Sequence, residues 1–530
     1  MILPIVKHEC FGDAACAVPG KLTYSYEAVS PIAALGAEAF GVFSKAIPCT
    51  EGGFVRFAPD STLEEKDEIY RVTVTADGMT VGFRDARGAI NGAATAALLL
   101  RQGALKQGEI VDYPSCGYRS LMIDMARGLP KIEDVETAVY YMALAKYNRL
   151  HLHLIDSEGP CYVSEALPEY RFTGKGEQCD KATLRRLADL CRRFAIEIVP
   201  EIEVPAHATA IAVAHPEFKC QVENADGWTV CPGNDDVWPF FEKLVGEVAE
   251  LFPDSEYLHI GTDELEFLDF KPQLYCHWSE CPRCAALRER EHLHDKRAEF
   301  YYVIDRMHDI VRACGKKMIM WNDQIDVSGQ VPISRDIVIE FWRVACKGRG
   351  PHAGCSMEGF LKKGFKVINA DYPNTYFDIE SYLTTEKIKT WTPYTAPAQA
   401  PQYAAQVLGG EACAWEFGNE AEYPFYGYVT PLVAAVFADK LWALGTREHD
   451  ADYRRALAEL VFGSAEHTDV FDLVGSILPP RKKNKFTYAE PSALSKEALA
   501  ACTARLQRTI LCPAKKSYLH LIEKIAEAQN

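Results

Sequence analysis

Apolar and polar positions follow a period of two in the first part of the chain. In residues 68–84, apolar side chains alternate with polar ones on both sides of an Asp77-Gly78 pair, which is typical of a β-hairpin turn. The segment RGAINGAATAALLLRQ, residues 87–102, is rich in Ala and Leu and predicts a helix that covers one face of this sheet. We therefore predict that residues 1–115 form an α+β accessory domain with a packing or positioning role.

From residue 116 the pattern changes to short apolar runs that alternate with helical segments, which predicts parallel βαβ units. The predicted strands span residues 119–125, 149–155, 196–204, 257–260, 317–321, 336–341, 365–370 and 407–414. Eight such units close a TIM barrel. The predicted fold class is thus α/β, a (β/α)8 TIM barrel over residues 116–450.

Beyond residue 450 the periodicity is that of helices. Leu499, Cys502, Leu506 and Ile510 are spaced along one face of a predicted helix. We predict a C-terminal helical region over residues 451–530.

The stretch YLHIGTDELE, residues 257–266, ends an apolar run with two adjacent carboxylates, Asp263 and Glu264. A strand followed by Gly261 places both just beyond the carboxyl end of the strand, where α/β barrels carry their chemistry. The alternative is a helix N-terminus, where acidic residues are solvated and favoured by the helix dipole. The residues alone leave both interpretations open.

The charge balance restricts the classes of partner. The chain has 57 basic and 74 acidic residues and a formal net charge of −17, which repels phosphate backbones and anionic lipid surfaces. We expect no nucleic-acid partner and no membrane partner, since no apolar run approaches the length of a membrane span.

The first residues do not form the apolar core of a signal peptide, because Pro4, Lys7 and His8 interrupt them. We therefore expect a cytoplasmic protein whose 18 cysteines stay reduced. Secretion after removal of a leader stays open.

A series of motifs lies in a fixed order along the predicted barrel. These are IDMARGLP at 123–130, HLHLIDSEG at 151–159, PEIEVPAH at 200–207, HIGTDE at 259–264, Trp321, FWR at 341–343, YFD at 376–378 and GGEACAWE at 409–416. The series, over roughly residues 80–440, resembles the family 20 glycoside hydrolases, the β-N-acetylhexosaminidases. The helix at 87–102 also resembles that family's amino-terminal accessory domain.

The resemblance implies a retaining mechanism in which the substrate's own 2-acetamido oxygen attacks the anomeric carbon and forms an oxazoline intermediate. Glu264 would protonate the leaving oxygen and later deprotonate water. Asp263 would hold the acetamido N–H and offset the developing positive charge. Tyr376 would bond the acetamido oxygen, or would instead be an ordinary half-buried tyrosine.

The resemblance also implies a set of substrate contacts. Arg127 and Asp378 would bind sugar hydroxyls, although Arg127 could instead form a salt bridge at the barrel rim. Asp156 and His207 would form a pair behind Glu264 that tunes its proton affinity. The last members of the set are Trp321, Trp342 and Trp415. They would line the sugar-binding pocket or instead belong to the core.

Three positions depart from the family pattern. Thr262 stands where a second glycine is usual, and Asn322-Asp323 follows Trp321 where Asp-Glu is frequent. The family's sugar-binding glutamate aligns with Phe417, one residue after Glu416, so the role of Glu416 is open. These departures bear on the choice between gluco and galacto substrates and remove no catalytic group.

Cys276, Cys281 and Cys284 have a spacing that resembles a zinc site, which His277 or the distant Cys231 could complete. The alternative is that they are reduced packing thiols. The implied catalysis needs no metal, and we expect no cofactor.

We conclude that the most favoured function is exo-acting release of terminal β-linked N-acetylglucosamine or N-acetylgalactosamine. The expected partner is a glycan with a terminal N-acetylhexosamine, and a homodimer stays open. The alternatives are a narrow β-N-acetylgalactosaminidase and a catalytically silent sugar-binding barrel.

Overall fold

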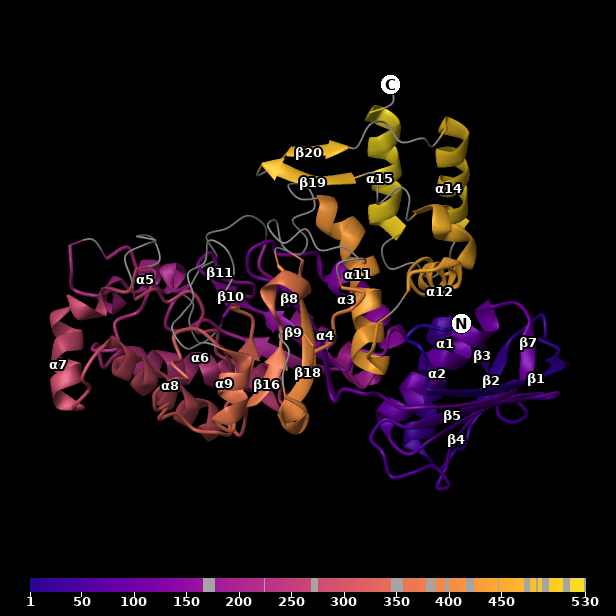
Figure 1. Ribbon diagram of the computed structural model, residues 1–530, viewed down its shortest axis with the longest axis horizontal. Coiled ribbons are helices and arrows are strands. Elements are labelled where there is room, and N and C mark those ends of the chain that lie inside the picture. The colour runs from indigo at the N-terminus through magenta and orange to yellow at the C-terminus, as the bar shows by residue number, and fades with distance from the viewer. Residues whose placement is uncertain are drawn as a thin grey trace.

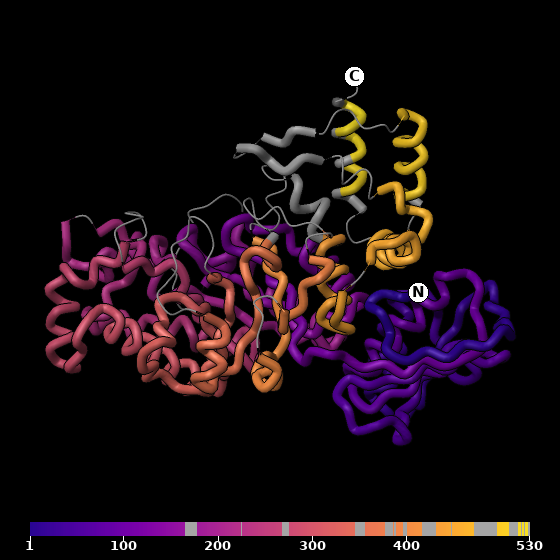
Figure 2. Tube along the Cα trace, viewed as in Figure 1, coloured from indigo at the N-terminus to yellow at the C-terminus, as the bar shows by residue number. Residues whose placement is uncertain are grey.

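The computed structural model gives three regions, an N-terminal sheet with helices, a barrel and a C-terminal segment (Figure 1). It describes all residues except 165–176, 224, 268–274, 345–355, 378–384, 386–387, 396–399, 416–423, 447, 471–476, 483–484, 489–494, 509–514 and 529–530. The trace in Figure 2 runs from the N-terminal sheet through the barrel and then returns to α12 (Ala451–Phe462), which contacts the N-terminal helix α2 (Ala86–Arg101).

The N-terminal unit is a seven-stranded sheet in the order β1-β7-β5-β6-β4-β2-β3. The strands are β1 (His8–Cys16), β2 (Thr23–Tyr26), β3 (Ile47–Pro48), β4 (Val55–Pro59), β5 (Tyr70–Thr75), β6 (Gly78–Phe83) and β7 (Leu105–Asp112). Helices α1 (Pro31–Ser44) and α2 pack together, and α2 covers β5 and β6 as predicted. The Asp85 side chain caps α2 by accepting from the Gly88 N–H.

The predicted hairpin is β5 and β6, but its turn lies one residue earlier than expected. Thr75 pairs with Gly78, so Ala76 and Asp77 form the turn. Gly78 is needed for a different reason, since a Cβ there would lie 2.3 Å from the carbonyl oxygen of Phe54, the residue before β4.

The barrel consists of parallel strands in the order β16-β15-β14-β13-β12-β9-β8-β18, and a pairing of β16 with β18 closes it. The eight strands are β8 (Tyr118–Asp124), β9 (Arg149–His153), β12 (Glu197–Glu201), β13 (Tyr257–His259), β14 (Lys317–Trp321), β15 (Val338–Phe341), β16 (Lys366–Asn369) and β18 (Val407–Ala414). Each predicted strand overlaps one of these, and the TIM barrel is therefore confirmed.

Helices lie between the barrel strands and after the last one. They are α3 (Ile132–Leu144), α4 (Lys181–Arg193), α5 (Thr209–Ala214), α6 (Val237–Leu251), α7 (Pro282–Arg290), α8 (Lys296–Ala313), α9 (Met357–Lys362), α10 (Tyr372–Thr375) and α11 (Pro424–Ala443). Short strands β10 (Ile155–Asp156), β11 (Gly159–Pro160) and β17 (Tyr376–Phe377) lie within the connections. None of the helices in the described part of the chain is long and apolar enough to cross a membrane.

The C-terminal segment is not entirely helical, contrary to the prediction. It contains α12, α14 (Lys496–Arg508) and α15 (Lys515–Ala528), but also a hairpin of β19 (Ile477–Lys482) and β20 (Lys485–Tyr488). Pro479 and Pro480 exclude a helix at β19, because proline lacks the N–H that a helix interior needs. In α14 the predicted apolar face is buried, and Ile510 lies outside the described residues.

A buried polar cluster joins the N-terminal unit to the barrel. Asp112 of β7 accepts hydrogen bonds from Tyr70 Oη and Trp442 Nε1, each at 2.8 Å, and pairs with Lys146 Nζ at 3.3 Å. Asp112 and Lys146 are fully or almost fully buried. Removing one member would leave buried polar atoms without partners, so these contacts hold the two units together. The division at residues 115 and 450 stays a prediction.

Candidate active site

Chemically reactive side chains gather at the carboxyl ends of four neighbouring barrel strands, β8, β9, β12 and β13. Asp124 ends β8, Asp156 follows β9, His207 follows β12, and Asp263 and Glu264 follow β13. Because carboxyl ends of parallel strands meet at one rim of a barrel, residues from distant motifs come into contact here.

The two adjacent acids face the same side. His207 Nε2 lies 3.3 Å from Asp263 Oδ2 and 3.8 Å from Glu264 Oε2. Residues 263–264 form a turn after β13, not the first turn of a helix. Asp263 is 8% exposed, and its buried Oδ1 has no hydrogen-bond partner among the described residues. A buried carboxylate oxygen without a protein partner is suited to accept a hydrogen bond from a ligand.

The backbone around the acids is strained. His207, Thr262 and Glu264 have φ values of +53°, +89° and +52°, a region that costs non-glycine residues energy. Thr262 Oγ1 donates to the Trp321 carbonyl at 3.2 Å, which offsets part of this cost. Gly261 is required, because a Cβ there would lie 1.8 Å from Glu203 Oε2.

The predicted pair of Asp156 and His207 is in contact. Asp156 Oδ1 lies 3.1 Å from His207 Nδ1, and Asp156 Oδ2 lies 2.9 Å from His153 Nε2 and 2.6 Å from Arg127 Nη2. Burial disfavours the charged imidazole, but Asp156 and Asp263 raise the pKa of His207 well above its usual value. The closer carboxylate of the acid pair is Asp263, whereas the sequence suggested a pair behind Glu264.

The electrostatics of this network keep Asp263 ionised. Burial acts to raise the pKa of Asp263, yet the neighbouring His207 lowers it below the usual value. For Asp156, Arg127 and His207 overcome burial and hold the pKa well below its usual value. At neutral pH, His207 is therefore an imidazolium that lies between the carboxylates of Asp156 and Asp263.

Arg127 forms the ion pairs of the barrel rim. Its Nη1 lies 3.0 Å from Asp124 Oδ2, its guanidinium also pairs with Asp156, and its Cζ lies 5.1 Å from the Trp415 ring centroid. The side chain is 23% exposed, so one face remains accessible. A direct contact with sugar hydroxyls stays a prediction.

The four aromatic residues that the sequence predicted for the pocket lie in one cluster with Met122, Ala370 and Cys413. They are Trp321, Trp342, Tyr376 and Trp415. Trp342 and Tyr376 stack with centroids 5.8 Å apart and planes 11° apart, and Trp415 lies 5.7 Å from Tyr376. Trp415 Nε1 is buried without a hydrogen-bond partner in the described ranges. Trp321 is 1% exposed and donates to Glu201 Oε1 at 2.8 Å, so it is a core member of the cluster.

Two residues that the sequence did not single out support the acids. Trp228 Nε1 donates to the Glu264 carbonyl at 3.1 Å, and the Trp228 ring lies 4.3 Å from that of His207. Asp323 Oδ1 accepts from the Glu264 N–H at 3.3 Å, and Asp323 Oδ2 accepts from Trp342 Nε1 at 2.5 Å. Trp228 lies in a loop without periodicity, whereas Asp323 was noted only as a departure from the family pattern. Asp378, Glu416 and Phe417 lie outside the described residues.

Two kinds of side-chain cluster contain residue types that can bind a metal ion, one of His and carboxylate groups and one of cysteines. Buried His and carboxylate groups around His151, His153 and Glu201 in the barrel are mutually paired by hydrogen bonds. Cys281 and Cys284 meet Cys220 and Cys231, whereas Cys276, which the sequence placed with them, is not part of that group.

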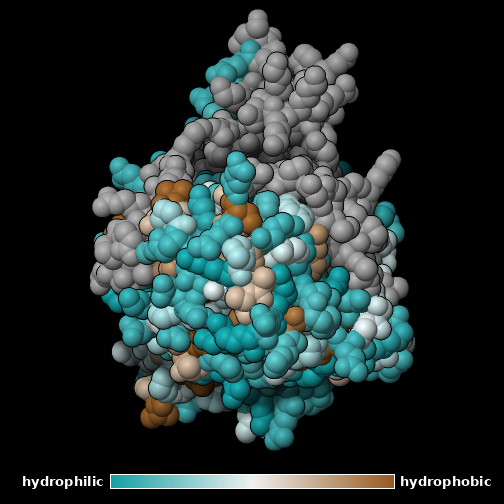
Figure 3. Space-filling model, turned by 90° about the vertical axis from the view of Figure 1, so that its left-hand side faces the viewer, coloured by the Kyte–Doolittle hydropathy of each residue, from teal (hydrophilic) through white to brown (hydrophobic). Residues whose placement is uncertain are grey.

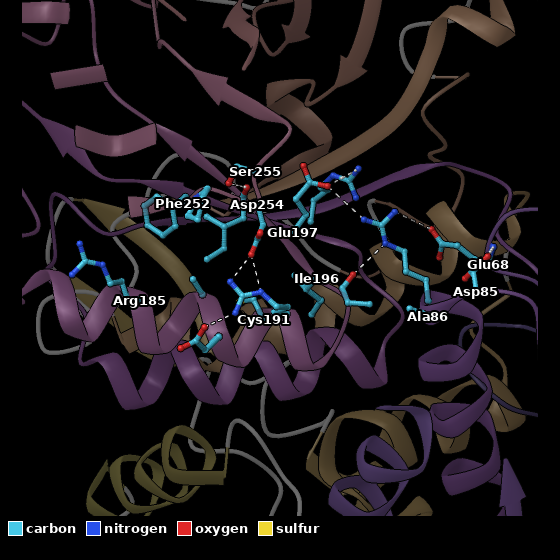
Figure 4. Close-up of a pocket in the computed structure, with 18 of the residues that line it drawn as sticks. Glu68, Asp85, Ala86, Arg185, Cys191, Ile196, Glu197, Phe252, Asp254 and Ser255 are labelled. Carbon is cyan, nitrogen blue, oxygen red and sulfur yellow. Dashed lines mark hydrogen bonds and ion pairs between the residues drawn. The ribbon is translucent and has the colours of Figure 1, made fainter. Parts of the chain in front are cut away.

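A separate cavity of about 940 Å³ lies at the opposite end of the barrel, between the N-terminal unit and the starts of the strands (Figure 4). It is lined by Glu197, the first residue of β12, and by Ser255, just before β13. Several of its charges are already paired, as Arg192 is with Asp254 and Arg149 with Glu197. Its location at the amino-terminal end does not favour it as the catalytic site.

Comparisons with known proteins agree with the geometry. The model of the glycosyl hydrolase family 20 catalytic domain matches residues 116–443, and that of domain 2 of the same family matches residues 34–113. The chain is 27% identical to a β-hexosaminidase of Porphyromonas gingivalis over 502 residues, which cover 86% of this chain and 62% of that protein. It is 32% identical to a β-hexosaminidase of Akkermansia muciniphila over 258 residues, which cover 44% of this chain and 50% of that protein. The chain thus spans between half and two thirds of the length of these relatives.

Solved structures have the same fold. A chitobiase from Flavobacterium johnsoniae superimposes with a TM-score of 0.73 at 18% identity, over 99% of this chain and 92% of that chain. The exo-β-N-acetylglucosaminidase of Vibrio harveyi in complex with N-acetylglucosamine gives a TM-score of 0.72 at 22% identity, over 91% of this chain and 78% of that chain.

Proposed function

Because the chain belongs to glycosyl hydrolase family 20, we propose that it is an exo-acting retaining hydrolase that releases terminal β-linked N-acetylglucosamine or N-acetylgalactosamine. The reaction is substrate-assisted and passes through an oxazoline intermediate. The names of the β-hexosaminidase relatives support the choice of substrate class.

The observation that carries the proposal is the arrangement of the acid pair. Both carboxylates lie beside His207 Nε2, and Asp263 Oδ1 is buried without a hydrogen-bond partner in the described part of the chain. Burial raises the pKa of Tyr376, and Asp263 adds to the rise, as expected for groups that lie near one another. In the proposed complex the acetamido N–H binds at Asp263 and the acetamido oxygen binds at Tyr376.

In the first step, the acetamido oxygen forms a bond to the anomeric carbon while the glycosidic C–O bond breaks. Glu264 donates a proton to the departing oxygen, which leaves as the alcohol. Asp263 accepts the acetamido N–H and offsets the positive charge of the oxazolinium ion. In the second step, Glu264 removes a proton from water as the water opens the ring, and the original configuration is restored.

His207 and Asp156 position Asp263 in this scheme. The imidazolium stabilises the ionised form of Asp263, and Asp156 keeps the imidazole protonated. Trp342, Tyr376 and Trp415 present flat apolar faces to the sugar and to the acetamido methyl group.

The test is hydrolysis of aryl β-N-acetylglucosaminide and β-N-acetylgalactosaminide by the unmodified chain and by Glu264→Gln. We expect the substitution to lower kcat by about 10²–10⁴, the usual contribution of a general acid. Glu256→Gln is the matched control, since Glu256 precedes the same strand at its opposite end and pairs with Lys317. Full turnover in Glu264→Gln would refute the assignment.

An N-trifluoroacetyl substrate tests the identity of the nucleophile. Its carbonyl oxygen is less nucleophilic, so turnover should fall steeply. An unchanged rate would instead point to a nucleophile supplied by the protein. Release from the galactosaminide alone would narrow the activity to β-N-acetylgalactosaminidase, and binding of N-acetylglucosamine without hydrolysis would favour a silent sugar-binding barrel.

A further inference from the structure

Four cysteines that are distant in the sequence form one buried group. Cys220 and Cys231 lie between α5 and α6, and Cys281 and Cys284 lie at the start of α7. All four are free thiols and are 5% exposed or less. Their sulfur atoms lie within 4.8 Å of one another.

The spacing of the sulfur atoms matches a single tetrahedral metal ion. A zinc ion with Zn–S bonds of about 2.3 Å holds its four sulfurs about 3.8 Å apart. Cys231 Sγ lies 3.6 Å from Cys281 Sγ and 3.6 Å from Cys284 Sγ. These distances exceed a disulfide bond, which is about 2 Å long. An iron–sulfur cluster would separate its ligands further, because several iron and sulfide atoms stand between them.

We propose that Cys220, Cys231, Cys281 and Cys284 bind one Zn²⁺ ion in a closed, structural site. Four thiolates satisfy the coordination of zinc and leave no position for substrate or water. The site has no part in the chemistry of Asp263 and Glu264.

Backbone N–H groups around the sulfur atoms donate hydrogen bonds to one of them, as metal-bound thiolates require. The Gln221 backbone N–H donates to Cys281 Sγ at 3.4 Å, and the Cys284 backbone N–H also bonds that sulfur. Such donors stabilise the negative charge of metal-bound thiolates. Gly233 lets the two segments approach, because a Cβ there would lie 2.3 Å from the Arg283 backbone.

The metal would add stability to the part of the fold around α7. In α7 only Cys284 and Leu287 are buried. The end of the molecule where α7 lies is largely hydrophilic, with only scattered hydrophobic side chains (Figure 3). A short helix with so little apolar contact gains much from a metal crosslink.

The same crosslink would hold the candidate active site together. The connection that contains Cys220 and Cys231 also carries His207 and Trp228, which contact Asp263 and the Glu264 backbone. Cys281 and Cys284 belong to the connection that carries Asp263 and Glu264. Zinc thus fixes two catalytic connections to each other. This effect on turnover rests on the proposed function, whereas metal binding does not.

The first test is elemental analysis of the full chain. We expect one zinc ion per chain in the unmodified protein, and a loss of at least tenfold in zinc content for Cys231→Ser and for Cys281→Ser. Cys276→Ser is the matched control, because Cys276 is a buried thiol five residues before Cys281 that lies outside the group. It should keep one zinc ion. Loss of zinc in the control, or full zinc in both ligand variants, would overturn the ligand assignment.

The second test uses the unmodified chain and so does not depend on the folding of variants. An organomercurial reagent that modifies thiols should release one zinc ion per chain, detected with a metal-binding dye. Release should also increase hydrogen exchange in residues 225–234. No released zinc and no uptake of added Zn²⁺ would overturn the proposal, as would iron in place of zinc. Because none of these measurements uses a sugar substrate, they stand or fail independently of the proposed hydrolase activity.

Discussion

Replacement of Asp263 by asparagine tests the electrostatic part of the mechanism. The substitution keeps the shape of the side chain and removes a negative charge from a position that is 8% exposed. The nearby His207 lowers the pKa of Asp263 against the opposing effect of burial, so the charge is present at neutral pH. In the variant, nothing at this position offsets the charge that develops on the oxazolinium ion.

The magnitude follows from Coulomb's law. Two unit charges about 4 Å apart at an effective dielectric constant of about 20 interact with about 4 kcal/mol. Since about 1.4 kcal/mol is a factor of ten in rate, kcat should fall by about 10³. The ground state of a neutral substrate lacks this charge, so KM should change much less than kcat.

The assay is steady-state hydrolysis of a series of aryl β-N-acetylglucosaminides with leaving groups of different pKa. The loss in Asp263→Asn should be similar across the series, because the charge develops on the sugar. The loss in Glu264→Gln should shrink for good leaving groups, which need no proton. Asp254→Asn, an exposed carboxylate that pairs with Arg192, is the control. A loss below tenfold in Asp263→Asn, or one that follows the leaving group, would refute the reasoning.

Three further predictions concern stability. Asp112→Asn should lower the free energy of unfolding by about 3–5 kcal/mol, measured by urea denaturation, because it leaves the buried Lys146 without its carboxylate; a loss below 1 kcal/mol would contradict this. Thr262→Gly should leave the melting temperature unchanged or raise it, since the relief of strain at φ +89° offsets the loss of one hydrogen bond and of a buried side chain. A marked fall in melting temperature would show that these lost contacts outweigh the strain. Burial opposes protonation of His153, but Glu201 raises the pKa of His153 to about 10. The stabilisation of the folded state by protonated His153 is therefore complete below about pH 6.5 and is lost as the pH rises towards 10. Urea denaturation at several pH values should show this decline, and His153→Gln should weaken it; an equal pH dependence in the variant would exclude the imidazolium.

The barrel was predictable because its signal is local. Each strand is a short apolar run followed by a helix, and each predicted run overlaps an observed strand. The boundaries of 317–321 and 407–414 agree with β14 and β18. The C-terminal hairpin was missed because the helical periodicity of its neighbours dominated, although Pro479 and Pro480 were the signal against a helix.

The candidate site was predictable only in part. The motifs gave Asp156, His207, Asp263 and Glu264, and the structure brings them into contact. Trp228 carried no signal, because it lies in a loop and its role depends on a contact across the fold with the Glu264 carbonyl. The preference of His207 for Asp263 over Glu264 depends on differences of a few tenths of an ångström that no motif encodes.

The cysteine group shows the same limit. The Cys281 and Cys284 spacing is a sequence signature, and Cys231 was named as one of two candidate partners. Cys220 was missed and Cys276 was wrongly placed with the group, because proximity along the chain does not measure proximity in the fold.

The amino-acid sequence by itself determined the order of strands and helices, since hydrophobic periodicity and turn residues act over a few neighbouring positions. It also determined which reactive groups the barrel rim would carry, because a motif after a strand is placed by that strand. Only the tertiary structure decided which of these groups touch, which carboxylate the imidazolium pairs with and which four thiols meet. These outcomes depend on the closure of the barrel and on the packing of long connections, where residues far apart in the chain come within a few ångströms.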